Sequence, residues 1–386
     1  MIFGRHSVLK RGCSTWDKAG MPQEEFERRL DAARREMAQR NLDALVIYGD
    51  NYSFGDLCYL TNYFPKVRGG FAVVPRQGAI SLLLHIGSRD IPFAKSLTWV
   101  DDVRASGQIG RDAAKIVKEK TLAKAKIGLM DSGKGLPLPQ WEEMKSALPE
   151  VGWQECHALF EQMRLRKSPR ELSSMRRAGA LLRDLCQGVE RFVRTGRKEY
   201  EVIADIDRLA RDGGAEDIRV LAGAKRLQPP SFNMNGTIDR HWSIYLAIQH
   251  ERYWVETGRS YILSGDGKLN DSYQKARDTV ARMAAGLTPG GATKTVSEAA
   301  RQSLADFYTS AVNYGFGQGI GLNQWEAPFL SPDDARQVGA PAVGAAAVEE
   351  NMTMALRAVL ESADALVLFG DSLEVTKGGA KSLLAQ

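Results

Sequence analysis

The sequence predicts an α/β domain over residues 1–163, followed by an α+β domain over residues 164–386. Three observations lead to this prediction. The chain has 386 residues, which is more than a single hydrophobic core usually supports. Short apolar runs alternate with helical patterns in the first part, as is typical of α/β domains. The second part instead combines long helical patterns with pairs of strand-like runs, which is typical of α+β domains.

The N-terminal part begins with an amphipathic helical pattern. Between residues 22 and 40, apolar residues recur at helical spacing with charged residues between them. These apolar residues are Phe26, Leu30, Ala33 and Met37. Four later runs have the length and composition of strands, namely residues 44–48, 70–74, 80–84 and 126–130. Helical patterns separate the runs, so we expect a sheet covered by helices.

A basic segment over residues 164–172 marks the predicted domain boundary. Ser168 is placed to cap a helix that Pro169 opens, and this helix is expected to run to about residue 194. Further helices are expected over residues 200–211, 276–285 and 295–308. Further strands are expected over residues 243–248, 253–263, 365–369 and 372–375.

The composition excludes several classes of protein. Charged residues make up 26% and apolar residues 44% of the chain, and these values are those of globular proteins. No apolar stretch approaches the roughly 20 residues that span a bilayer, and the charged N-terminus lacks a signal-peptide core. We therefore expect a cytoplasmic protein without membrane contact. The net charge of +5 is spread over both halves, so nucleic acid is not an expected partner.

The four cysteines are scattered and contain no CxxC pair, so we expect neither a disulfide framework nor a cysteine metal cluster. Cys58 lies beside Tyr59 in a segment with functional character. A catalytic thiol at Cys58 stays open as an alternative to the usual buried, apolar role of a free cysteine.

Residues 314–328, YGFGQGIGLNQWEAP, form the most informative segment of the chain. Glycines alternate from Gly315 to Gly321, so the backbone can approach a neighbour closely, and Gln318 is the polar side chain among them. The spacing fits neither GxGxxG nor GxxxxGK[ST], so a nucleotide loop is not predicted. The segment resembles the GHGIG…HEAP segment of the creatinase, Xaa-Pro aminopeptidase and methionine aminopeptidase superfamily. This resemblance implies the pita-bread fold.

The resemblance also implies where the metal ligands of the superfamily's metallopeptidases would fall. The five positions are Tyr245, Glu256, Gln318, Arg357 and a position near Gly370. Only one of them retains a carboxylate, whereas zinc, manganese or cobalt sites need three or more His, Asp, Glu or Cys ligands. We therefore expect no metal and no other cofactor.

The resemblance places His241 at the position of the superfamily's pocket histidine. An imidazole can move a proton in either direction near neutral pH, so we expect His241 to act as acid or base. Glu256 is the second expected catalytic residue, because it can orient His241 or bind a substrate cation. A salt bridge from Glu256 to Arg259 or Arg357 is an equally open interpretation.

Other residues are expected to bind substrate. Arg357, Arg259 and Gln318 are expected to hold a carboxylate, because arginine binds carboxylates through paired donors. Three more pocket candidates follow from the resemblance, namely Tyr245, Trp325 and Glu326. Arg68 ends a segment, residues 59–68, that resembles one reaching the neighbouring subunit's pocket, so a homodimer with composite sites is expected.

The preferred interpretation is a metal-independent hydrolase that cleaves a carbon–nitrogen bond of a small, polar, carboxylate-bearing compound, similar to creatinase or ectoine hydrolase. Three alternatives stay open. The first is a lyase that uses the same residues. The second is a non-catalytic pita-bread protein that binds peptide or protein. The third is a metal-dependent Xaa-Pro aminopeptidase.

Overall fold

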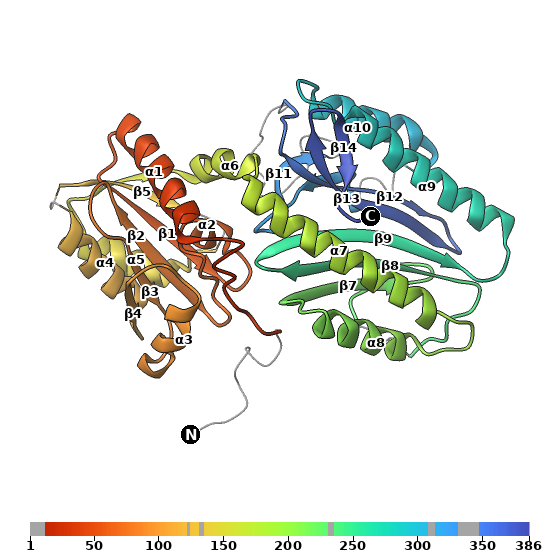
Figure 1. Ribbon diagram of the computed structural model, residues 1–386, viewed down its shortest axis with the longest axis horizontal. Helices are drawn as coiled ribbons and strands as arrows, with labels where there is room; N and C mark the ends of the chain where they lie inside the picture. Colours follow the sequence, from red (N-terminus) through yellow and green to blue (C-terminus); the bar gives the residue numbers. More distant parts are fainter. Residues whose placement is uncertain are drawn as a thin grey trace. The chain divides into compact units, whose positions relative to one another are not determined.

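The structure is a computed structural model that describes residues 12–121, 124–130, 135–230, 235–307, 313–330 and 347–385. The chain divides into two compact units, Met1–Arg164 and Leu165–Gln386. The boundary expected from the sequence lies one residue earlier. Each unit is built around a sheet of its own (Figure 1).

The N-terminal unit contains a six-stranded mixed sheet with strand order β4-β3-β2-β1-β5-β6. Its strands are β1 (Ala44–Asp50), β2 (Gly69–Pro75), β3 (Ser81–Leu84), β4 (Asp102–Ala105), β5 (Lys126–Met130) and β6 (Gly152–Glu155). The four predicted runs correspond to β1, β2, β3 and β5. The short edge strands β4 and β6 were not predicted, because each has only four residues and a weak apolar pattern.

Helices cover this sheet, as the alternating pattern predicts. They are α1 (Gln23–Gln39), α2 (Gly55–Thr61), α3 (Ile91–Ser96), α4 (Ile109–Lys120), α5 (Leu138–Ala147) and α6 (His157–Leu165), which crosses the unit boundary. Val46 and Ile47 are neighbours in β1, so their side chains point to opposite faces of the sheet, and both are fully buried. The sheet is therefore covered on both faces.

The first helix of the C-terminal unit, α7 (Pro169–Phe192), begins where the sequence predicts. The Ser168 hydroxyl accepts from the Glu171 backbone N–H at 3.2 Å, and the Glu171 carboxylate accepts from the Ser168 N–H at 3.0 Å. This reciprocal capping box satisfies two of the backbone donors that a helix start leaves without partners, and Pro169 supplies the favoured first residue.

Three further helices follow, namely α8 (Glu199–Asp212), α9 (Gly267–Gly286) and α10 (Thr293–Ser303). Helix α9 begins nine residues before the predicted start at residue 276, because Asp266 caps it by accepting from the Lys268 and Leu269 N–H groups. Helix α10 ends at Ser303, and a 3₁₀ turn over Ala305–Phe307 follows it. The expected helix end at Tyr308 lies outside the described residues.

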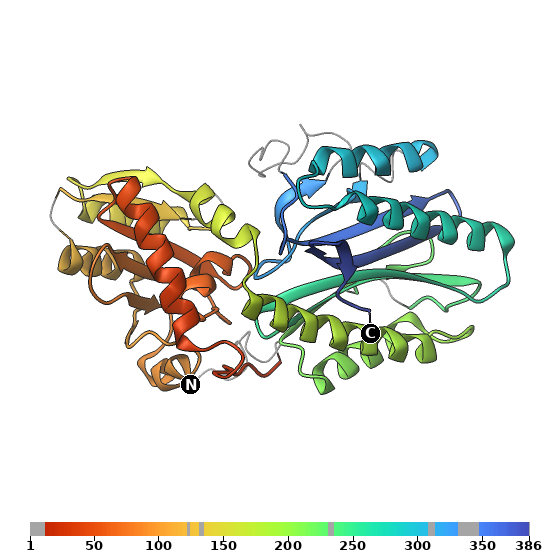
Figure 2. The same cartoon turned by 45° about the horizontal axis from the view of Figure 1, so that its top comes forward.

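The C-terminal unit contains an eight-stranded sheet with the order β11-β10-β12-β13-β9-β8-β7, and β14 pairs with β13. The strands are β7 (Asp217–Gly223), β8 (His241–His250), β9 (Tyr253–Ile262), β10 (Gly317–Gly319), β11 (Glu326–Leu330), β12 (Thr353–Glu361), β13 (Leu366–Thr376) and β14 (Gly379–Ser382). The two runs predicted at 365–369 and 372–375 form one continuous strand, β13. Figure 2 shows α7 and α8 along β7 to β9, and α9 along β12 and β13.

The two halves of this sheet meet at a pair of glycines. Gly258 of β9 lies opposite Gly370 of β13, and this is the backbone pair between the two strands. A Cβ on Gly370 would lie 3.0 Å from the Gly258 nitrogen, so the strands approach too closely for side chains at this point. Side chains reinforce the contact, because Thr257 donates to the Gly370 carbonyl at 2.8 Å and Ser372 donates to the Glu256 carbonyl at 2.8 Å.

No helix in the described part of the chain is both long and apolar enough to cross a membrane.

Strand β10 carries Gln318 between two glycines, and it lies between β11 and β12. A Cβ on Gly319 would lie 2.3 Å from the Ala327 carbonyl oxygen, which belongs to backbone and cannot rotate away. We therefore expect Gly319→Ala to lower the free energy of unfolding by about 1–3 kcal/mol, as overpacked sites do. Urea unfolding measures this change. The control is Gly267→Ala, where no atom lies within 4 Å of the added carbon. Equal stability of the two variants would contradict the close approach.

Candidate active site

Four residues from four strands converge on one face of the C-terminal sheet. They are Tyr245 of β8, Glu256 of β9, Gln318 of β10 and Arg357 of β12. The register explains the convergence, because Tyr245 lies opposite Gly258, Gly258 opposite Gly370, and Gly370 opposite Arg357. Residues that lie opposite one another share a face of the sheet. All four residues are among those expected from the sequence. Together with Gln324 and Arg219, they are called the central cluster.

Glu256 lies at the middle of the central cluster, and its side chain is only 4% exposed. Its Oε1 atom accepts from Arg357 Nη1 at 3.1 Å and from Gln318 Nε2 at 3.2 Å. Its Oε2 atom accepts from the Tyr245 hydroxyl at 2.6 Å and from Gln324 Nε2 at 3.4 Å. A carboxylate offers about four acceptor positions. The chain itself therefore supplies donors for all of them.

Arg357 is fixed by acceptors on two sides. Its Nε donates to the Tyr314 carbonyl at 2.7 Å, and its Nη1 donates to Gln318 Oε1 at 2.6 Å as well as to Glu256. Its side chain is 15% exposed, so it is the more accessible partner of the ion pair with Glu256. Of the two salt bridges left open by the sequence, Arg357 rather than Arg259 forms the bridge to Glu256.

The central cluster contains two residues that were not expected from the sequence, namely Gln324 and Arg219. Gln324 Nε2 donates to the Tyr245 hydroxyl at 2.5 Å, and Arg219 Nη1 donates to Gln324 Oε1 at 2.5 Å. Arg219 also stacks over the Trp254 ring at 4.6 Å from its centroid. Strand pairing explains why Arg219 belongs to the cluster. Arg219 lies opposite Ala247, and Ala247 lies opposite Glu256. Strand β7 itself was not predicted, so this row could not be read from the sequence.

The Tyr245 hydroxyl is a hydrogen-bond donor at ordinary pH. Burial, and to a lesser extent the negative charge of Glu256, raises the pKa of Tyr245 well above its usual value. The phenol therefore stays protonated, donates to Glu256 and accepts from Gln324.

His241 does not join the central cluster. It lies at the start of β8, where its Nε2 is 2.7 Å from the Ala224 carbonyl oxygen. His241 pairs with Ile262, whereas Glu256 pairs with Ala247. Six residues of β9 thus separate the two positions, which corresponds to about 20 Å. The structure does not support the expectation that Glu256 orients His241.

Arg259 lies on the opposite face of the sheet from Arg357. Three residues separate Arg259 from Glu256 in β9, and an odd separation places side chains on opposite faces. Arg259 Nη1 donates to the Gly370 carbonyl at 2.5 Å, and its guanidinium stacks 4.5 Å from the Phe369 ring centroid. The expected donor pair of Arg259 and Arg357 is therefore wrong.

The other expected binding residues have different surroundings. Glu326 is buried and paired with Lys167 Nζ at 3.1 Å, and it also accepts from the Asn323 N–H at 2.9 Å. Trp325 is 65% exposed, and its neighbour Gln324 turns into the central cluster in its place. Cys58 is 1% exposed within α2, which fits the apolar role.

Arg68 belongs to the N-terminal unit. It has a left-handed backbone with φ of 55°, and its Nη1 is 2.7 Å from His85 Nε2. The contribution of Arg68 to a neighbouring subunit, the homodimer and the cytoplasmic location all stay predictions.

Comparisons with known proteins identify relatives for both units. Residues 173–377 match the model of metallopeptidase family M24, and residues 29–166 match that of the creatinase/prolidase N-terminal domain. An Xaa-Pro dipeptidase of Pyrococcus horikoshii is 22% identical over 308 residues, which are 77% of this chain and 82% of the dipeptidase. An uncharacterized hydrolase/peptidase of Sinorhizobium fredii is 28% identical over 200 residues, about half of each chain.

Solved structures show the same fold over nearly the whole chain. The prolidase of Pyrococcus horikoshii superposes with a TM-score of 0.78 at 19% identity, and covers 93% of this chain and 98% of its own. A dipeptidase of Mycobacterium ulcerans superposes with a TM-score of 0.74 at 22% identity, and covers 97% and 98%. The predicted pita-bread fold with a creatinase-like N-terminal domain is confirmed.

The comparisons correct one expectation. The preferred interpretation described a metal-independent enzyme, whereas the matching family is one of metallopeptidases and the relatives include an Xaa-Pro dipeptidase. These findings support the peptidase alternative. The expected metal independence is wrong for the metallopeptidase family to which the relatives belong.

The described residues nevertheless do not fit the metal of that family. The positions that the family resemblance assigns to ligands hold Tyr245, Glu256, Gln318, Arg357 and a residue near Gly370, and of the four residues fixed by the resemblance only Glu256 is a strong ligand. The Arg357 cation lies 3.1 Å from that carboxylate, and no group of three or more His, Cys, Asp or Glu suited to a metal ion occurs among the described residues.

The ion pair between Glu256 and Arg357 predicts strong energetic coupling. Glu256→Gln or Arg357→Met alone leaves an uncompensated buried charge and should lower the free energy of unfolding by about 3–5 kcal/mol. The double variant removes both charges, so its loss should be well below the sum of the single losses. Urea unfolding of the four proteins measures this coupling. Asp364→Asn breaks the exposed Lys225–Asp364 pair and should cost less than about 1 kcal/mol. Additive losses would argue against the pair.

The raised pKa of Tyr245 predicts that the folded protein loses stability at alkaline pH. Its pKa in the folded chain is raised above the value of about 10 in the unfolded chain, so its contribution is complete below pH 10. Above this pH the unfolded phenol releases its proton first, which costs about 1.4 kcal/mol per pH unit. Tyr245→Phe should make the decline of unfolding free energy with pH shallower by about this amount. The control is Tyr52→Phe, at a tyrosine that is 76% exposed. Identical slopes in wild type and Tyr245→Phe would exclude the effect.

Proposed function

Because the chain belongs to metallopeptidase family M24, whose members are hydrolases of carbon–nitrogen bonds, we propose that it cleaves a small peptide with a free carboxylate, of the Xaa-Pro dipeptide class. The similarity to an Xaa-Pro dipeptidase supports this choice of substrate. The observation that carries the proposal is the pairing of Arg357 with Glu256 on one face of the sheet.

Arg357 is the group that recognises the substrate carboxylate. Its guanidinium is already oriented by the Tyr314 carbonyl and Gln318, so little side-chain freedom is lost when an anion binds. A substrate carboxylate offers the same acceptor chemistry as Glu256 and can share the donors of Arg357. Binding of an anion next to the pair would release Glu256 from part of its contact with Arg357.

Glu256 and Tyr245 have complementary chemical roles in this proposal. Once partly released, Glu256 accepts a proton from a water whose oxygen adds to the substrate carbonyl carbon. The Tyr245 O–H turns from Glu256 to the substrate carbonyl oxygen and donates its one hydrogen bond there, where negative charge develops in this step. Glu256 then passes the proton to the leaving nitrogen, the carbon–nitrogen bond breaks, and one water is consumed. Gln324 orients the Tyr245 hydroxyl by donating to it, and Arg219 orients Gln324 by donating to its side-chain oxygen.

A dipeptide panel tests the proposal. We expect Ala-Pro and Gly-Pro to be cleaved with release of proline, and Ala-Pro amide to have a kcat/KM lower by about tenfold, because it lacks the carboxylate that Arg357 binds. Glu256→Gln should lower kcat by about a hundredfold, and Arg357→Gln should mainly raise KM. Release of the N-terminal amino acid, a product common to the free acid and the amide, is measured in buffers with manganese, cobalt, zinc or chelator, so that turnover is detected under each condition.

The matched control is Glu216→Gln. Glu216 is also a buried carboxylate paired with an arginine, Arg252, but it lies outside the central cluster. Its loss should destabilise the protein and leave kcat/KM unchanged. Equal rates on the free acid and the amide would refute recognition by Arg357. Dipeptide binding without turnover under any condition would assign the central cluster a binding role without catalysis. Cleavage without oxygen transfer from labelled water would indicate a lyase.

A further inference from the structure

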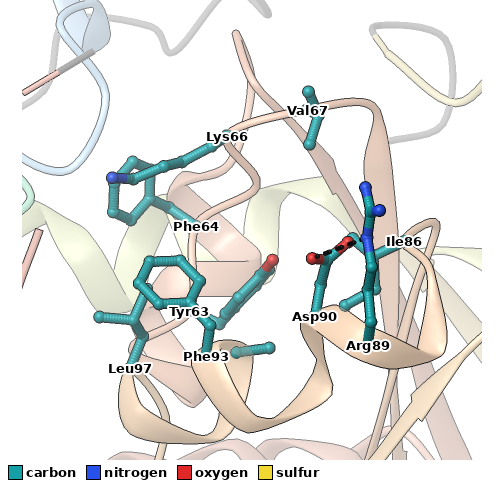
Figure 3. A pocket seen from close by; sticks show the side chains of 10 residues that line it. Tyr63, Phe64, Lys66, Val67, Ile86, Arg89, Asp90, Phe93 and Leu97 are labelled. Carbon is teal, nitrogen blue, oxygen red and sulfur yellow. Dashed lines mark ion pairs between the residues drawn. The ribbon is translucent and has the colours of Figure 1, made fainter. Parts of the chain in front are cut away.

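The N-terminal unit contains a cavity of about 410 Å³ whose lining shares no residue with the central cluster. One wall consists of residues 63–67, which come directly after helix α2. The other consists of residues between 86 and 97, in and around the 3₁₀ turn Ser88–Asp90 and helix α3 (Figure 3). The cavity lies among Tyr63, Phe64, Lys66, Val67, Ile86, Arg89, Asp90, Phe93, Ala94 and Leu97. Its volume lies within the range of roughly 300–1,000 Å³ that is usual for small-molecule sites.

The two walls are tied together, so the cavity exists before any ligand binds. The Asn62 side chain donates to the Leu97 carbonyl at 3.1 Å, and the Thr98 hydroxyl donates to the Thr61 carbonyl at 2.5 Å. Phe64 is fully buried and packs with its ring centroid 5.5 Å from that of Phe54. A preformed site loses little conformational freedom on binding, which favours affinity.

Most of the lining is apolar and part of it is aromatic. Phe93 is 52% exposed, which is unusual for a side chain of this size. In Figure 3 the Phe93 ring lies beside Tyr63 and Leu97 at the cavity. Flat apolar groups pack well against such rings, in stacked or edge-to-face arrangements. The cavity therefore suits a ligand with an apolar and preferably aromatic body.

The polar groups at the cavity are mainly donors. Lys66 is only 8% exposed, its Nζ lies 5.8 Å from the Phe93 ring centroid, and it also donates to the Gly12 carbonyl at 3.2 Å. Arg89 adds a second cation, and its Nε lies 3.6 Å from Asp90 Oδ1. With two cations and one carboxylate, the described lining residues carry one net positive charge.

The Tyr63 hydroxyl is a further donor. Figure 3 shows it directed across the cavity toward the side of Asp90, and no hydrogen-bond partner for it occurs among the described residues. Burial, reinforced by the charge of Asp90, raises the pKa of Tyr63, so the phenol stays protonated.

We propose that this cavity binds a small monocarboxylate with an apolar, preferably aromatic, body. The body lies against Phe64, Phe93 and Leu97, and the carboxylate accepts from Lys66 and the Tyr63 hydroxyl. A single negative charge balances the single net positive charge of the lining, whereas an amine would be repelled by Lys66 and Arg89.

Calorimetric titration of the full chain tests this site with three probes of one shape, namely phenylacetate, phenylacetamide and phenethylamine. We expect phenylacetate to bind, and the neutral amide and the amine to bind roughly tenfold more weakly or not at all. Phe93→Ala and Arg89→Gln change exposed side chains, so neither endangers folding. Both should weaken phenylacetate binding, and Lys66→Met should weaken it by roughly tenfold.

Arg357→Gln must retain one phenylacetate site, because that arginine belongs to the C-terminal unit. Loss of all binding in an Arg357→Gln protein that circular dichroism shows to be folded would place the ligand there and overturn the proposal. Tighter binding of phenethylamine, or unchanged binding in both Phe93→Ala and Arg89→Gln, would overturn it as well. A protein that associates with itself in sedimentation, and stops doing so in Phe93→Ala, would assign the cavity to a second copy of the chain.

Discussion

The contact between Gly258 and Gly370 is the constraint on which the C-terminal unit depends. It joins two antiparallel half-sheets through one backbone pair, where any larger side chain would separate the strands. Because Tyr245 lies opposite Gly258 and Arg357 lies opposite Gly370, the same contact sets the distance between the two halves of the central cluster. Ser372 and Thr257 hold the strands together through bonds to backbone, so they fix the position of Glu256 without touching its carboxylate.

The charges around Glu256 determine which ligands can bind beside it. Glu256 is buried and fully supplied with donors, and its charge is compensated by one cation directly and by a second through Gln324. A closed network of this kind is stable only while every member is satisfied. A ligand that enters must replace bonds that it breaks, and an anion does this at Arg357 better than a neutral or cationic group. Affinity and substrate class are thus linked to the same few hydrogen bonds.

Local signals in the sequence predicted the fold well. Ser168 and Pro169 mark the start of α7 because capping depends on neighbouring residues alone, and the glycine alternation around Gln318 marks a strand that is tightly enclosed. Four members of the central cluster were found through a family resemblance. The sequence-based expectations were wrong where the direction of a side chain determines whether two residues meet. Arg259 is close to Glu256 in sequence, yet the alternation of β9 places it on the other face.

Strand register explains the remaining differences between the residues expected at the site and those that the structure brings together there. His241 shares a face with Glu256, but six residues of strand separate them, and a distance of this kind appears only once the pairing of β8 and β9 is known. Gln324 and Trp325 differ by one position, and the backbone just before β11 turns the first inward and leaves the second in solvent. Arg219 could not be predicted before β7 was placed beside β8.

The shared charges of the central cluster also limit how this chain can evolve. A single substitution at Glu256 or Arg357 passes through a protein with a buried unpaired charge, at a cost that is large against a total stability of about 5–15 kcal/mol. Only paired changes avoid that intermediate. Descendants of this sequence should therefore keep both residues or replace both, so the two positions are inherited as one unit.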